Sequence, residues 1–157
     1  MNLYLVQHGE ALSSEDDPAR PLSAKGAEHV HRIGVFLRSS AALSVPEVLH
    51  SGKARAEQTA DILAHHLNSI CSAGPDLNPN DDPGLWSAHL AAREKDVMLV
   101  GHLPHVQRLA GLLLCGDASS LPVGFTNAGV VCLVRDKDGR WQLNWAMRPE
   151  LLPQDVS

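Results

Sequence analysis

The stretch that decides the fold is residues 2–11, with the sequence NLYLVQHGEA. Residues 3–6 form an apolar run of strand-forming side chains that is too short for an independent helix, so they predict a buried strand. The run ends abruptly in Gln7, His8 and Gly9. Open α/β sheets usually bind ligands at the carboxyl ends of their strands, where glycine permits close approach of the backbone. His8 is therefore a candidate site residue, although a histidine satisfied within the core explains this stretch alone equally well.

Length and composition favour one globular domain over residues 1–157. A chain of this length can bury a sizeable core, and its 44% hydrophobic content is typical of soluble globular proteins. No apolar run approaches the roughly 20 residues that cross a bilayer, so we expect no membrane partner. The aromatic content of 4% and the net charge of −5 argue against a nucleic-acid partner, because stacking and phosphate contacts need aromatic and basic side chains.

The amino terminus and the cysteines indicate a cytoplasmic protein. The chain starts directly with strand-forming residues and shows neither the basic segment nor the cleavage site of a secretory leader. Its three cysteines, Cys71, Cys115 and Cys132, are odd in number, widely spaced and free of any C-x-x-C pair. We expect them to be reduced rather than to form a disulfide framework or a zinc site.

Strand and helix patterns alternate along the rest of the chain. Further strands are predicted at 47–51, 96–101, 130–134 and 141–147, and helices after Ser23, at 54–67, near 85–93 and after Pro104 as far as Gly116. The first helix is expected to bury Val30 and Ile33 and to turn Arg32 to solvent. Residues 72–84, rich in Pro, Gly, Asn and Asp, predict a long loop, and the last two strands predict a hairpin. This order predicts a three-layer α/β/α sandwich whose mostly parallel sheet is mixed at the hairpin edge.

Two of the predicted strands end at histidines, and helices start close to them. His8 and His102 follow strands, and Arg55 and Pro104 lie at the starts of helices. Helix N-termini and arginine side chains bind anions, and a neutral imidazole is a competent nucleophile toward phosphorus. These residues favour phosphoryl transfer or phosphate binding. A metal site is a weaker interpretation, because no carboxylate keeps metal-ligand spacing with His102 and His105.

Five short blocks of the sequence resemble the motifs of one family. Residues 7–10, QHGE, resemble an Arg-His-Gly motif, and residues 20–26, RPLSAKG, resemble R-P-L-T-x-x-G. Residues 51–59, SGKARAEQT, resemble S-P-x-x-R-A-x-Q-T, and residues 101–104, GHLP, match [SG]-H-x-P. This ordered set covers nearly the whole chain and resembles the histidine phosphatase superfamily, in particular its SixA-type phosphohistidine phosphatases. The pair Asn144-Trp145 recurs in this SixA-type subgroup.

The resemblance implies a phosphoglycerate mutase-like fold and a phosphatase that uses neither a metal nor another cofactor. It implies that His8 is the nucleophile and forms a transient phosphohistidine. It further implies that Arg55 and His102 hold the phosphoryl group with the backbone N–H of Leu103, and that Arg20 lies at the pocket mouth. The implied partners are the phosphate ion and a phosphohistidine-bearing protein, such as a phosphotransfer domain in signalling or a phosphocarrier.

Gln7 departs from the family pattern, which has arginine at this position. Glutamine offers neutral donors in place of a charged one, so we expect weaker phosphate binding and reduced activity. Two hypotheses stay open. His8, Arg55 and His102 favour an active phosphatase, whereas Gln7 favours a member that binds phosphate or a phosphorylated partner without turnover. Lys53, two residues before Arg55, offers a compensating charge, although a solvated surface lysine is the simpler interpretation.

The proton donor to the leaving group is not identified by these motifs. Many members of the superfamily place an acidic residue before the strand of the second histidine, and Asp82 is a candidate here. Its interpretation as a turn-forming residue is the better supported one. The P–N bond of phosphohistidine is labile, so its cleavage does not require a strong acid.

Overall fold

The structure, a computed structural model, describes residues 1–154. Six strands form one sheet in the spatial order β3-β2-β4-β1-β5-β6. The strands are β1 (Asn2–Gln7), β2 (Glu47–His50), β3 (Ile70–Ala73), β4 (Val97–Gly101), β5 (Val130–Arg135) and β6 (Trp141–Met147). The first four are parallel to one another, whereas β5 runs antiparallel to β1 and β6 antiparallel to β5. The predicted mostly parallel sheet with an antiparallel hairpin at one edge is confirmed.

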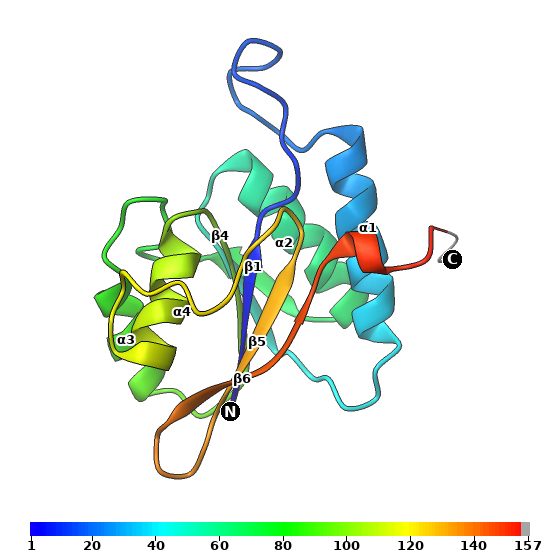
Figure 1. Ribbon diagram of the computed structural model, residues 1–157. Coiled ribbons are helices and arrows are strands. Elements are labelled where there is room, and N and C mark those ends of the chain that lie inside the picture. The colour runs from blue at the N-terminus through cyan, green and yellow to red at the C-terminus, as the bar shows by residue number, and fades with distance from the viewer. Residues whose placement is uncertain (155–157) are drawn as a thin grey trace.

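Two pairs of helices cover the two faces of this sheet (Figure 1). The helices are α1 (Ala24–Arg38), α2 (Ala54–Leu67), α3 (Pro83–Ala91) and α4 (His105–Cys115), and a short 3-10 helix, η1 (Pro149–Leu151), follows the last strand. Helix α1 packs beside α2 on one face, and α3 packs beside α4 on the other. The predicted three-layer α/β/α sandwich is confirmed.

The central strand β1 supplies both layers of the core. Its alternate side chains Tyr4 and Val6 pack toward α1 and α2, and Leu3 and Leu5 pack toward α3 and α4. All four are buried. Burial of each aliphatic side chain contributes about 1.5–3 kcal/mol of transfer free energy, so this strand is held from both faces. A rigid β1 fixes the position of the residue that follows it, His8.

Local sequence signals set the ends of the helices. The Gly26 N–H donates to Ser23 Oγ at 3.0 Å, which makes Ser23 the N-cap that the sequence predicts for α1. Gly116 ends α4 at a φ of 71°, in the left-handed conformation that favours glycine. Gly26 also lies so close to Glu10 that a Cβ atom would overlap the Glu10 carbonyl oxygen. This contact holds the segment after β1 against the start of α1.

The expectation that Arg32 faces solvent is wrong. Its side chain is buried and donates to the carbonyl oxygens of Pro149 at 2.9 Å and Leu152 at 2.6 Å. The cause is the C-terminal segment, which returns to lie beside α1 in Figure 1 and covers a helix face that the local pattern leaves polar. None of the helices within residues 1–154 is long and apolar enough to cross a bilayer.

The strand β3 falls partly within the predicted loop 72–84, so that expectation is wrong at its start. At this edge of the sheet three of the four side chains are exposed, and Ile70 is 73% exposed. Such a strand lacks the apolar alternation by which strands are recognised. Helix boundaries shift by smaller amounts. Helix α3 runs from Pro83 to Ala91, and Pro104 precedes α4 as its N-cap residue.

Candidate active site

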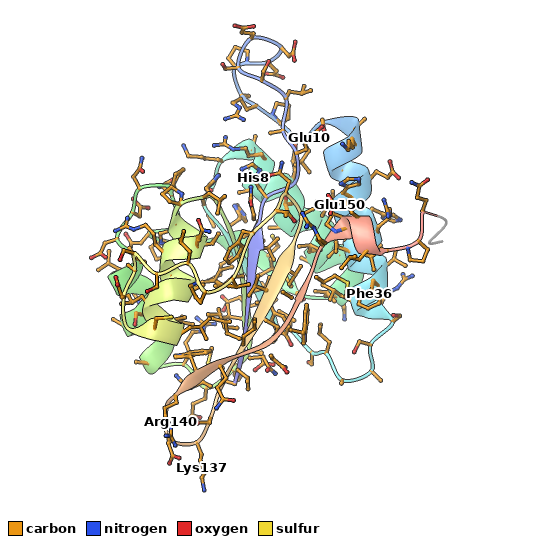
Figure 2. The ribbon with its side chains drawn as sticks, in the orientation of Figure 1. His8, Glu10, Phe36, Lys137, Arg140 and Glu150 are labelled. Atoms are coloured by element: carbon orange, nitrogen blue, oxygen red, sulfur yellow. The ribbon has the colours of Figure 1, made fainter. Side chains whose placement is uncertain are left out.

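The register between β1 and β4 brings the two predicted histidines together. Gln7 pairs with Gly101 at the carboxyl ends of these parallel strands, so His8 and His102 are the next residues of each. The His8 N–H donates to the Gly101 carbonyl at 3.0 Å, and the two rings lie 5.0 Å apart at 55°. Figure 2 shows His8 at the end of β1, below the loop that begins near Glu10.

The ring of His8 is held in one orientation by its own turn. Nδ1 lies 2.7 Å from the Gly9 carbonyl oxygen, which can only accept, so Nδ1 carries the proton and Nε2 keeps its lone pair. Burial lowers the pKa of His8, and the charges of Arg55 and Arg20 lower it further, against the raising effect of the Gly9 hydrogen bond. A neutral ring with a free Nε2 is the form that attacks phosphorus.

His102 is more deeply enclosed than His8. Its side chain is 2% exposed, and Nε2 lies 2.6 Å from Ser51 Oγ. Burial, followed by the charges of His8 and Arg55, lowers its pKa to about 3. The ring is therefore neutral near pH 7. An anion bound between the histidines would favour its protonated form, which is how a histidine of this kind stabilises developing negative charge.

Helix α2 brings an arginine to the same place. Arg55 lies in its first turn, and Nε of the guanidinium has no hydrogen-bond partner among the described residues. Thr59, one turn later, donates through Oγ1 to the Arg55 carbonyl at 2.7 Å and accepts the Gly9 N–H at 3.0 Å. Since Thr59 is fully buried, this link ties the turn after His8 to the helix that carries Arg55.

Arg20 lies close to these residues from the loop before α1. Its Nε donates to the Leu12 carbonyl at 3.1 Å, and its backbone adopts a φ of 48°, which is uncommon for a residue other than glycine. Its charge lowers the pKa of both His8 and Arg55. The position of Arg20 at the mouth of the site stays a prediction.

Gln7 makes a neutral contact at the position of the family's arginine. Its Nε2 donates to Asn127 Oδ1 at 2.8 Å, and Oε1 is buried without a partner in the described part of the chain. The backbone of this loop is fixed as well, because the Ala128 N–H donates to the Gln7 and His8 carbonyls at 3.0 and 3.2 Å. Gln7 thus faces the loop before β5 and adds no charge to the site.

The remaining candidates differ in their surroundings. Among the described residues, the Leu103 N–H donates to no backbone carbonyl, which leaves it available to an anion. Lys53 is exposed, as expected of a surface lysine, yet its charge is among those that lower the pKa of His102. Asp82 accepts the Gly84 N–H at 2.8 Å and caps α3, which agrees with the turn-forming interpretation.

Three residues around the site were not singled out from the sequence. Ser51 and Thr59 both lie within the block at 51–59, so the motif could have identified them. Their hydrogen bonds, with His102 and Gly9, join segments distant in sequence and are visible only in the folded chain. Asn127 gave no signal, because its contact with Gln7 joins residues 120 positions apart. Within residues 1–154, no group of three or more His, Cys, Asp or Glu side chains is arranged to hold a metal ion.

A sequence comparison relates this chain to known proteins. Over 156 residues the chain is 32% identical to the phosphohistidine phosphatase SixA of Escherichia coli (strain K12), a match that covers 95% of this chain and 94% of that protein. The chain belongs to the SixA family of histidine phosphatases. No protein-family model matches the chain.

Solved structures agree with this membership of the SixA family. A structure of the protein histidine phosphatase SixA complexed with tungstate has a TM-score of 0.83 at 30% identity and covers 96% of this chain and 99% of that one. The α-ribazole phosphatase of Shigella flexneri has a TM-score of 0.77 at 15% identity, which shows the shared fold alone. The resemblance and the phosphoglycerate mutase-like fold are confirmed, and the SixA relatives are phosphatases, which supports a hydrolase.

Proposed function

We propose that this SixA-family chain hydrolyses phosphohistidine on a protein partner, with His8 carrying the phosphoryl group between two steps. The observation that carries the proposal is the Nδ1 hydrogen bond of His8 to the Gly9 carbonyl, which leaves Nε2 of a neutral ring free to attack. The partner class is a signalling phosphotransfer domain or a phosphocarrier in the cytoplasm. The reaction uses no metal ion or other cofactor.

The first step moves the phosphoryl group from the substrate to the enzyme. Nε2 of His8 forms a new P–N bond while the P–N bond of the substrate histidine breaks. The electron pair stays on the substrate nitrogen, which takes a proton from a water molecule, so the ring leaves as neutral imidazole. The hydroxide left by that water is neutralised by the proton that the second step releases. Arg55, the Leu103 N–H and His102 donate to the equatorial oxygens, where negative charge accumulates.

The second step releases phosphate. The oxygen of a water molecule attacks the phosphorus on His8, the P–N bond to Nε2 breaks, and its electron pair returns to the ring. The proton of the water passes to solvent, so the enzyme is regenerated with inorganic phosphate as the product. The same donors serve both steps, because the charge develops on the same three oxygens.

The charges around the site support an oxyanion ligand. Arg55 and Arg20 both lower the pKa of His8, and Arg55 and Lys53 lower that of His102, so the charge of each of the three cations acts on at least one of the two histidines. Tungstate, present in the SixA structure described above, is a tetrahedral oxyanion like phosphate. We expect tungstate to compete with the substrate for this chain's site.

A second candidate function is phosphate or phosphoprotein binding without turnover. The observation that favours it is the contact of Gln7 Nε2 with Asn127, which directs this amide to a loop and leaves the site one cation short of the family pattern. Loss of one such donor lowers rates by about 10²–10³ in comparable sites. The two functions share a ligand and differ in whether His8 is phosphorylated.

Hydrolysis of a small phosphoramidate separates the two functions. Phosphate release would be measured for wild type, His8→Ala and His65→Ala, whose histidine is exposed on α2 and serves as the matched control. We expect turnover in wild type and His65→Ala, insensitive to a chelator, and none in His8→Ala. Full turnover by His8→Ala would overturn the nucleophile assignment.

The binding arm uses tungstate and calorimetry. If wild type binds tungstate, shows no turnover, and loses binding in Arg55→Gln, the binding function replaces the phosphatase. Turnover that vanishes when a chelator is added and returns with a metal ion would contradict the cofactor-free mechanism.

A further inference from the structure

A third histidine is buried beside the proposed site. His105 is the first residue of α4, three residues after His102, and its side chain is 0% exposed. Neither ring nitrogen of His105 has a hydrogen-bond partner within the described residues, and Nδ1 of His102 has none either. The proposed reaction uses His102 and gives His105 no role.

Ring nitrogens in this situation need a partner. A neutral imidazole carries one N–H donor and one acceptor, and a buried polar group left without a partner destabilises the fold. Enclosed water molecules satisfy buried groups that lack a protein partner, each through about three hydrogen bonds. Three unpartnered nitrogens lie on two buried histidines three residues apart, His102 after β4 and His105 at the start of α4, so one shared partner would satisfy both rings.

The surroundings of His105 favour its neutral ring near pH 7. Burial lowers its pKa and so does Arg108, whereas the carboxylates of the loop before α3 raise it. These carboxylates are Asp76, Asp81 and Asp82. The charge of His105 is itself among the influences that lower the pKa of His102. A neutral His105 keeps one N–H to offer its neighbour.

We propose that His105 is a positioning residue for His102 in the reaction described above. Its ring N–H donates through one enclosed water to Nδ1 of His102, which fixes Nδ1 as the acceptor and places the hydrogen on Nε2. The Nε2–H then donates to Ser51 Oγ in the free protein and to a phosphoryl oxygen when substrate is bound. His8 needs the opposite tautomer and obtains it from the Gly9 carbonyl.

The tautomer of His102 is a property of the resting protein, so NMR tests it without any turnover. Ring nitrogen shifts would be recorded near neutral pH for wild type, His105→Leu and His105→Gln, with the His102 signals assigned by their loss in His102→Gln. We expect Nε2 protonated in wild type and in His105→Gln, whose amide N–H replaces the donor. His105→Leu fills a similar volume without a donor, so we expect its His102 to populate the Nδ1-protonated form.

The wild-type spectrum alone can overturn the inference, whether or not the variants fold. A wild-type His102 protonated on Nδ1 contradicts it, and so does a folded His105→Leu protein whose His102 keeps its hydrogen on Nε2. In the phosphoramidate assay we expect kcat to fall about fivefold to tenfold in His105→Leu, the effect of one neutral hydrogen bond, and to recover in His105→Gln. If wild type lacks turnover, the proposed function fails while the NMR result still decides this inference.

Discussion

Gln7 occupies the position at which the SixA-type motif has arginine, and its amide Nε2 donates a hydrogen bond to Asn127 Oδ1. A hydrogen bond with a charged donor contributes about 1.5–3 kcal/mol of stabilisation, whereas a hydrogen bond between neutral groups contributes about 1 kcal/mol. We therefore expect Gln7→Arg to raise kcat/KM for a phosphoramidate by about tenfold or more, up to the 10²–10³ that one lost donor costs in comparable sites. Gln7→Met, of similar length without donors, is the control and should not exceed wild type. Equal or lower kcat/KM in a folded Gln7→Arg protein would count against this account of Gln7.

The pKa of His8 sets the acid limb of the pH–rate profile. His8 attacks as the neutral ring, so kcat/KM falls as the pH drops through its pKa, which burial, Arg55 and Arg20 hold below the usual 6.5. A nearby cation disfavours the protonated ring, and its removal raises the pKa. We expect Arg20→Gln to move the acid limb to higher pH, whatever its effect on the maximum rate. An acid limb at unchanged pH would show that Arg20 does not act on His8.

Thr59 connects two elements, since it joins the turn after β1 to α2. Thr59→Val keeps the shape and removes the hydroxyl, so the buried Gly9 N–H loses its partner. We expect a loss of about 1–3 kcal/mol in the free energy of unfolding, measured with urea, and a lower kcat because Gly9 orients His8. Thr59→Ser keeps the hydroxyl and is the matched control. A Thr59→Val protein as stable and active as Thr59→Ser would remove this link from the account.

The elements were predictable from sequence where local pattern and packing agree. The apolar runs of β1 and β4 and the Ser23 cap gave correct elements, because the signal lies within each segment. The edge strand β3 and the buried Arg32 were missed, since partners distant in sequence create both. The candidate site followed the same rule: motifs pointed to His8, His102 and Arg55, whereas the Gln7–Asn127 contact exists only in the folded chain. The roles of these residues remain predictions.

For the molecule as a whole, buried histidines couple stability to pH. The pKa values of His8, His102 and His105 are all lowered on folding, so the unfolded chain binds more protons below pH 6.5 and stability falls as the pH falls. His102, whose pKa falls to about 3, contributes a loss of about 2 kcal/mol between pH 7 and pH 5. Urea unfolding at both pH values measures this loss.

In the same unfolding experiment at the two pH values, His102→Gln is the control for the pH effect. We expect its free energy of unfolding to change less between pH 7 and pH 5 than that of wild type, because one of the buried titrating rings is gone. A variant with the same pH dependence as wild type would show that His102 is not the source of the acid sensitivity.

The proposed function depends on β1 positioning His8 as the nucleophile that attacks phosphorus. The measurement that tests it most directly is the mass of the protein after brief mixing with phosphoramidate and quenching under alkaline denaturing conditions, in which phosphohistidine persists. We expect one phosphoryl group on wild type, located at His8 by fragmentation, and none on His8→Ala. Turnover by a wild-type protein that never carries this group, or a phosphoryl group on another histidine, would contradict the account.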